Sequence, residues 1–143
     1  MKRIVFFMIM IMLMLPLVDA KVFHQGRGNG RDDLRVSHIL INDQVFPTIR
    51  RGSSLSARIF LENTFDENID NLKVKMIIHD LGIYASNGPD DFDGSRTQVH
   101  LSTEIPSWVA PGMYYITFYF GNQRQRTDDP LVRKTVTRPL LIR

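Results

Sequence analysis

Residues 108–121 read WVAPGMYYITFYFG, and this stretch decides the fold. Pro111 and Gly112 predict a turn, because proline presets φ and glycine tolerates positive φ. The aromatic and β-branched residues that follow favour a long central strand whose side chains alternate between two faces. We expect Trp108 to cover one end of the core. The predicted inward residues are Tyr114, Ile116, Phe118 and Phe120, and the predicted outward residues are Met113, Tyr115, Thr117 and Tyr119.

The same alternation recurs through the rest of the chain, in runs separated by turn residues and without a helical period. Pro47 interrupts a short apolar patch and indicates an edge strand or a strand that changes sheets. Residues 80–95 contain the sequence SNGPDDFDG, whose turn formers predict irregular structure. The other predicted strands are residues 34–41, 55–62, 72–79, 97–105 and 131–142. These runs predict an all-β fold, an immunoglobulin-like antiparallel β-sandwich of about seven strands.

The first residues of the chain are typical of a secretory signal peptide. A basic start, Met1-Lys2-Arg3, precedes about fifteen mainly apolar residues, which are fewer than the roughly twenty that span a bilayer. We expect cleavage after Ala20, no membrane span after cleavage, and an extracellular or cell-surface location. Retention of the segment as an uncleaved anchor is the alternative. Residues 21–33 are rich in glycine and predict a flexible tether, so that residues 34–143 form one domain.

Composition narrows the class of protein further. The chain has no cysteine and no Asn-x-Ser/Thr site, which favours an exported prokaryotic domain that is stabilised by its core alone. The predicted leader holds two of the 18 basic residues and one of the 15 acidic residues, so the remainder is only weakly basic. We therefore expect no nucleic-acid partner.

Residues able to bind a metal or carry out catalysis are scattered. The four histidines are His24 in the tether, His38, and His79 and His100 on outward positions of strands that belong to opposite sheets. Asp90, Asp91 and Asp93 are weak candidates for a calcium loop, because their spacing does not fit an EF-hand. The chain has no nucleophile elbow and no pair of carboxylates placed for glycoside hydrolysis. We expect no enzyme activity, no cofactor and no dedicated metal site.

The most informative candidate site is a surface. In an immunoglobulin-like order, the strands beside the central strand are residues 72–79 and the terminal strand. Their outward residues would create an aromatic and basic face, where tyrosine rings stack on sugars or anchor a protein partner and cations favour anionic glycans. The alternative is an ordinary exposed sheet. The candidate contact residues are Tyr115, Tyr119, Lys73, Lys75, His79 and Arg133.

Several stretches resemble a known family. The stretches are DLRV at residues 33–36, GSSLSARIFLEN at 52–63, NLKV at 71–74 and APGMY at 110–114. Together they resemble the CARDB type of cell-adhesion-related domain over residues 33–142. The resemblance implies an immunoglobulin-like module of a bacterial or archaeal surface protein. In such a module, Asn63 would bond nearby backbone as its strand ends.

The sequence therefore predicts a non-catalytic exported binding or adhesion module that acts through contacts with a surface protein or a glycan. The alternative is a structural subunit of the cell envelope or surface layer that assembles by docking of strand edges.

Overall fold

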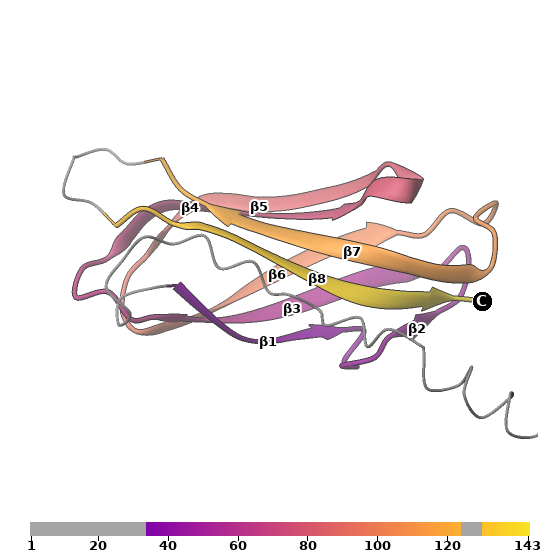
Figure 1. Cartoon of the computed structure of the whole chain (residues 1–143), viewed down its shortest axis with the longest axis horizontal. Helices are drawn as coiled ribbons and strands as arrows, with labels where there is room; N and C mark the ends of the chain where they lie inside the picture. Colours follow the sequence, from indigo (N-terminus) through magenta and orange to yellow (C-terminus); the bar gives the residue numbers. More distant parts are fainter. Residues whose placement is uncertain (1–33, 124–129) are drawn as a thin grey trace, which may run out of the picture.

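A computed structural model of the protein describes residues 34–123 and 130–143. The predicted signal peptide (1–20) and tether (21–33, with His24) lie outside the described residues. The described part folds into two facing sheets, as predicted, and all of its strand pairings except one are antiparallel (Figure 1). One sheet has three strands, and the other has five.

The strands match most of the predicted runs. A single turn of 3-10 helix, η1, spans His79–Leu81, so the strand predicted to reach His79 ends one residue earlier. The strands are β1 Leu34–Ile41, β2 Thr48–Ile49, β3 Ser54–Asn63, β4 Ile69–Ile78, β5 Ile83–Phe92, β6 Arg96–Glu104, β7 Gly112–Gly121 and β8 Arg133–Ile142. The three-stranded sheet has the order β1-β3-β6, and the five-stranded sheet has the order β2-β8-β7-β4-β5.

The core lies between the sheets, and alternation along each strand supplies it. The predicted inward residues of β3 and β4 are all buried: Leu55, Ala57, Ile59, Leu61, Leu72, Val74, Met76 and Ile78. On β7, Ile116, Phe118 and Phe120 are buried and Tyr114 packs against the core. Burial of these apolar side chains is the main driving force that holds the two layers together.

The central position predicted for the aromatic strand is confirmed. β7 pairs with β4 on one side and with β8 on the other, and both pairings are antiparallel. Thr117 points outward as expected but is only 9% exposed, because it lies between Ile77 and Thr137 in the register. Pro47 was predicted to mark an edge strand or a change of sheet, and both descriptions fit, since β2 follows it as the edge strand of the other sheet and pairs in parallel with β8.

Residues 80–95 are mostly a strand, so the prediction of irregular structure there was wrong. β5 pairs with β4 along its length, with two register shifts that accommodate the turn-forming residues. Gly88 has φ of +89°, and a Cβ there would lie 2.4 Å from the Leu72 carbonyl oxygen, so only glycine fits. Pro89 is tolerated because β5 is an edge strand. The composition of an edge strand that contains glycine, proline, asparagine and aspartate does not differ from that of a loop.

Two further local predictions were wrong and one is confirmed. Trp108 does not cover the core, because it is 72% exposed in the loop before β7. Gly112 is not among the glycines with positive φ and simply begins β7. The Asn63 side chain behaves as expected, since it donates to the Glu67 carbonyl at 2.8 Å and accepts from the Phe65 amide at 2.9 Å.

Candidate functional site

The outer face of the five-stranded sheet carries the predicted contact residues. Its side chains fall into rows that run across β4, β7 and β8. One row joins Lys75, Tyr119 and Thr135, because Tyr119 pairs with Lys75 on one side and with Thr135 on the other. Directly opposed side chains in a sheet lie about 4.5–5.5 Å apart at Cβ, so the Tyr119 ring and the Lys75 stem are neighbours.

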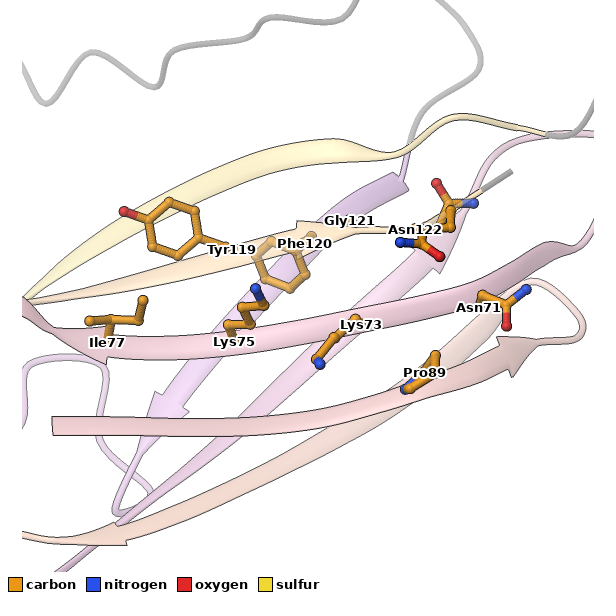
Figure 2. A pocket seen from close by; sticks show the side chains of 10 residues that line it. Asn71, Lys73, Lys75, Ile77, Pro89, Tyr119, Phe120, Gly121 and Asn122 are labelled. Atoms are coloured by element: carbon orange, nitrogen blue, oxygen red, sulfur yellow. The ribbon is translucent and has the colours of Figure 1, made fainter. Parts of the chain in front are cut away.

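The next row is hollow at its centre. Gly121 lies between Lys73 and Arg133 in the register and adds no side chain to the face. A groove of about 550 Å³ opens at this position (Figure 2). Its walls include Lys73, Lys75 and Ile77 of β4, Pro89 of β5, Tyr119 of β7 and Asn122 beyond β7. We call this the sheet groove.

Three cations on the outer face of the five-stranded sheet, which we call the groove face, have no acidic partner in the described part of the chain. Lys73, Lys75 and Arg133 form no ion pair with any carboxylate in residues 34–123 and 130–143. Lys73 and Lys75 are two residues apart on β4 and both line the sheet groove, so their like charges add there. An anion that entered the groove would meet positive charge that the described protein does not neutralise.

His79 positions the tyrosine of the groove. Its Nε2 atom lies 3.0 Å from the Tyr119 hydroxyl, and the two rings meet edge to face with centroids 6.2 Å apart. η1 brings His79 to this point directly after β4. This contact holds the hydroxyl end of Tyr119 and leaves the ring on the wall of the groove.

The six predicted contact residues are not equivalent. Lys73, Lys75 and Tyr119 line the sheet groove, and His79 bonds to Tyr119. Arg133 is exposed and faces the gap at Gly121. Tyr115 is 58% exposed. It lies nearer the start of β7, opposite Pro139 of β8, and does not line the groove.

Sequence reasoning missed the polar and proline walls of the groove. Pro89 was assigned to irregular structure, and no site role was predicted for Asn71, Asn122 or Gln123. Asn122 also has a structural role, because its side chain donates to the Asp70 and Pro130 carbonyls and accepts from the Val132 amide. The sequence does not show these three hydrogen bonds, because their backbone partners are brought to Asn122 only by the fold.

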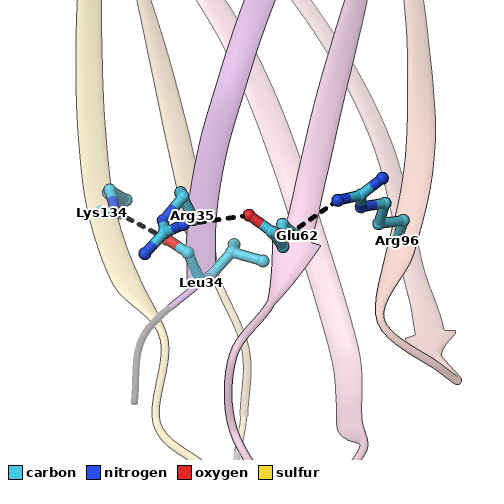
Figure 3. Close-up of polar contacts among 5 residues, drawn as sticks. All are labelled: Leu34, Arg35, Glu62, Arg96 and Lys134. Carbon is cyan, nitrogen blue, oxygen red and sulfur yellow. Dashed lines mark hydrogen bonds and ion pairs between the residues drawn. The ribbon is translucent and has the colours of Figure 1, made fainter. Parts of the chain in front are cut away.

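The opposite face of the molecule differs in its charges. On the three-stranded sheet, Arg35 and Arg96 both contact Glu62, at 3.3 and 3.4 Å (Figure 3). Arg58 pairs with Asp43. Figure 3 also shows Lys134 of β8 donating to the Leu34 carbonyl of β1 at 2.6 Å, a bond that joins the two sheets. Every arginine of β1, β3 and β6 therefore contacts a carboxylate.

The weak metal candidates are not assembled into a site. Asp90 and Asp91 are consecutive on β5, and Asp91 accepts a bond from the Asn71 amide at 3.0 Å. No group of three or more histidine, cysteine, aspartate or glutamate residues with metal-binding geometry exists in the described part of the chain. His100 lies on β6 of the three-stranded sheet, whereas His79 lies in η1 after β4 of the five-stranded sheet and not on a strand as predicted. The two histidines are not brought together, as expected.

One pair of side chains resembles part of a catalytic site. The Ser56 hydroxyl and His100 Nε2 lie 2.8 Å apart on the three-stranded sheet. Nucleophilic catalysis also needs a group that orients the histidine and donors for the developing oxyanion. Within the described residues, no hydrogen bond links His100 to a carboxylate.

The comparisons with known proteins show the fold. No family model matches the sequence, and no curated protein matches it. The Niemann-Pick type C2 protein from Japanese carpenter ant is 14% identical, with a TM-score of 0.51 over 80% of this chain and 96% of that one. The CARDB domain of a Pyrococcus furiosus protein, solved with di-metal ions, is 11% identical, with a TM-score of 0.50 over the same shares.

These similarities support the immunoglobulin-like β fold that the CARDB resemblance implied. Identities this low carry the fold alone, so the chain is not assigned to either family. Among the described residues, no helix is long and apolar enough to cross a membrane.

Proposed function

We propose that this protein is a non-catalytic binding module whose working surface is the outer face of the five-stranded sheet. The ligand would be an acidic glycan, bound at the sheet groove. The observation that carries this proposal is the pair of lysines, Lys73 and Lys75, which have no carboxylate partner among the described residues and lie beside the ring of Tyr119 in one groove.

Each part of the groove suits part of a sugar acid. The face of a tyrosine ring packs against the C–H face of a pyranose, while lysine ammonium groups bind carboxylate or sulfate. The hydrogen bond between Tyr119 and His79 orders the ring before the ligand arrives, which lowers the entropy lost on binding.

The size of the groove favours a glycan over a protein partner. Its volume of about 550 Å³ falls within the range of roughly 300–1,000 Å³ that is typical of small-ligand sites. A protein partner would instead be expected to use the wider exposed face, including Tyr115. Tyr115 is therefore the residue that separates the two modes of binding.

The test measures binding of an acidic polysaccharide and of the same polymer after its carboxyl groups have been reduced. We expect Lys73→Gln with Lys75→Gln to weaken binding of the acidic polymer at least about tenfold. The matched control is Arg35→Gln with Arg58→Gln, which removes two cations from the opposite face, away from β6, and should leave binding unchanged. Equal losses in both double variants would show non-specific attraction and sink the proposal.

Tyrosine variants test the second half of the proposal. Tyr119→Ala should weaken glycan binding, and Tyr115→Ala should not. If Tyr115→Ala weakens binding as strongly as Tyr119→Ala, the ligand covers the whole face and a protein partner is favoured. Absence of binding to either polymer would overturn the glycan assignment.

The proposed location is the cell surface or the extracellular space. The support is the leader-like sequence of residues 1–20, which lies outside the described residues. N-terminal sequencing of the protein recovered from its native compartment would test this. A start at Lys21 supports cleavage, whereas a start at Met1 in the membrane fraction supports the anchor.

A further inference from the structure

The free edges of the two sheets are not alike. A sheet edge exposes unpaired backbone N–H and C=O groups, and proteins usually interrupt such edges to prevent unwanted pairing. β1 has a register shift between Val36 and His38. β5 has two register shifts and contains Pro89. β8 is covered by β2 only at its end and elsewhere carries Pro139 and three basic residues.

β6 is the exception. Its residues Arg96–Glu104 pair with β3 in an unbroken register, without a shift, a proline or a glycine. It is the last strand of its sheet, and its backbone bonds to no strand on the outer side within the described residues. The inward-pointing Thr97, Val99 and Thr103 are only half-buried, because the core ends at this edge. A regular strand with these properties is a template for another strand.

The sequence of β6 is complementary to itself. It reads RTQVHLSTE, with His100 at its centre. If two copies of this strand lie antiparallel about His100, Arg96 is opposite Glu104 at both ends. Thr97 is then opposite Thr103, and Val99 is opposite Leu101. Opposite charges, paired threonines and paired apolar residues are all stabilising cross-strand neighbours.

We propose that the β6 edge binds the β6 edge of a second copy of this chain, with a two-fold axis at His100. The three-stranded sheets would join into one continuous six-stranded sheet. Glu104 has no ion-pair partner among the described residues of its own chain and would receive Arg96 of the second copy. Arg96 is free to turn, because its side chain is 81% exposed and its contact with Glu62 is 3.4 Å long.

The inward residues add an apolar component to the same interface. Val99 is half-buried and Leu101 is buried at the edge of the core. Pairing would cover Val99 with Leu101 of the second copy and remove its remaining surface from water. The proposal does not depend on the sheet groove, which lies on the other sheet. It names the strand and the partner for the alternative that the sequence left open, a subunit that assembles by docking of strand edges.

Cysteine cross-linking tests the register directly, because the chain contains no cysteine. Residues on the two-fold axis face their own copies with Cα atoms about 4.5–5.5 Å apart, within the reach of a disulfide. His100→Cys should therefore form a covalent dimer on mild oxidation. Gln98→Cys and Ser102→Cys should each fail alone but cross-link when the two are mixed, since position 98 is opposite position 102.

The control for random collision is Ser37→Cys, an exposed position on β1. Circular dichroism of each variant checks that it is folded. If His100→Cys cross-links no faster than Ser37→Cys, the proposed register is wrong. If Gln98→Cys cross-links with itself as fast as it does with Ser102→Cys, the pairing is not the one proposed.

A charge exchange tests the unmodified interface. Arg96→Glu places Glu opposite Glu at both ends, and Glu104→Arg places Arg opposite Arg. By sedimentation, each variant alone should dimerise at least about tenfold more weakly than the wild type. A mixture of the two should dimerise as well as the wild type, because both pairs are restored. Wild type that stays monomeric at its highest soluble concentration, or a mixture that stays weak, would overturn the proposal.

Discussion

The two outer faces of this sandwich use their cations differently. On the three-stranded sheet, Arg35 and Arg96 contact Glu62 and Arg58 contacts Asp43. On the five-stranded sheet, Lys73 and Lys75 line the sheet groove without a carboxylate partner among the described residues. Lysines without a carboxylate partner gain no ion-pair stabilisation in the folded state, and their charge is available to a ligand. The difference supports the proposal that the five-stranded sheet carries the binding surface.

The largest expected effect comes from the layer beneath the groove face. Phe118 on β7 is fully buried, whereas Tyr115 on the same strand is 58% exposed. Phe118→Ala should lower the free energy of unfolding by about 3–5 kcal/mol, because it removes a buried ring and leaves a cavity. Tyr115→Ala should leave the protein folded. Urea denaturation measures both, and a comparable loss in the two variants would contradict the assignment of inward and outward residues.

The next effect concerns the edge strand that carries Pro89. Gly88→Ala places a Cβ against the Leu72 carbonyl, in addition to the cost of a positive φ. We expect a loss of about 2 kcal/mol or more in unfolding free energy, with weakened glycan binding. Gly94→Ala is the matched control, since its φ is +96° but its Cβ would meet nothing within 4 Å. It should lose about 1 kcal/mol and retain binding.

The third prediction compares the charges of the two faces. Glu62→Gln removes the partner of Arg35 and Arg96 and should lower the unfolding free energy by no more than about 1 kcal/mol, as expected for surface ion pairs. Lys73→Gln with Lys75→Gln should leave stability unchanged or slightly raised, because it removes two neighbouring like charges. Thermal unfolding in low salt measures both. A clear loss of stability in the lysine variant would mean that these cations serve the fold.

The smallest expected effect comes from the bond between Tyr119 and His79. Tyr119→Phe keeps the ring and removes the hydroxyl that lies 3.0 Å from His79. The exposed bond should contribute about 0.5 kcal/mol or less to stability. Glycan affinity should fall less than in Tyr119→Ala, since the stacking surface remains. Titration calorimetry measures the glycan affinity of both variants. Equal losses of affinity in Tyr119→Phe and Tyr119→Ala would show that the hydroxyl, rather than the ring, contacts the sugar.

Much of this fold could be predicted because alternation has a direct cause. Residues such as Phe118 and Val74 face the core because a strand turns every second side chain to the same side. The neighbours of β7 followed from the order of an immunoglobulin-like sandwich. The same alternation predicted which residues of three adjacent strands point outward, whereas their role in binding stays a prediction.

The remaining features depend on contacts between distant residues. β5 was missed because Gly88 and Pro89 signal a turn, and only its pairing with β4 makes them part of a strand. The sheet groove was missed because it depends on Gly121, whose missing side chain matters only when Lys73 and Arg133 flank it. Trp108 was expected to cover one end of the core, yet it lies exposed in the loop before β7.

The position of the groove on the sheet opposite β6 has a consequence for polymeric ligands. A two-fold axis through His100 would run perpendicular to the shared sheet, so both copies would present their grooves in the same direction. A long glycan held by one groove would reach the other at a raised effective concentration, on the order of millimolar for a short flexible connection. Two weak sites could then act with high avidity.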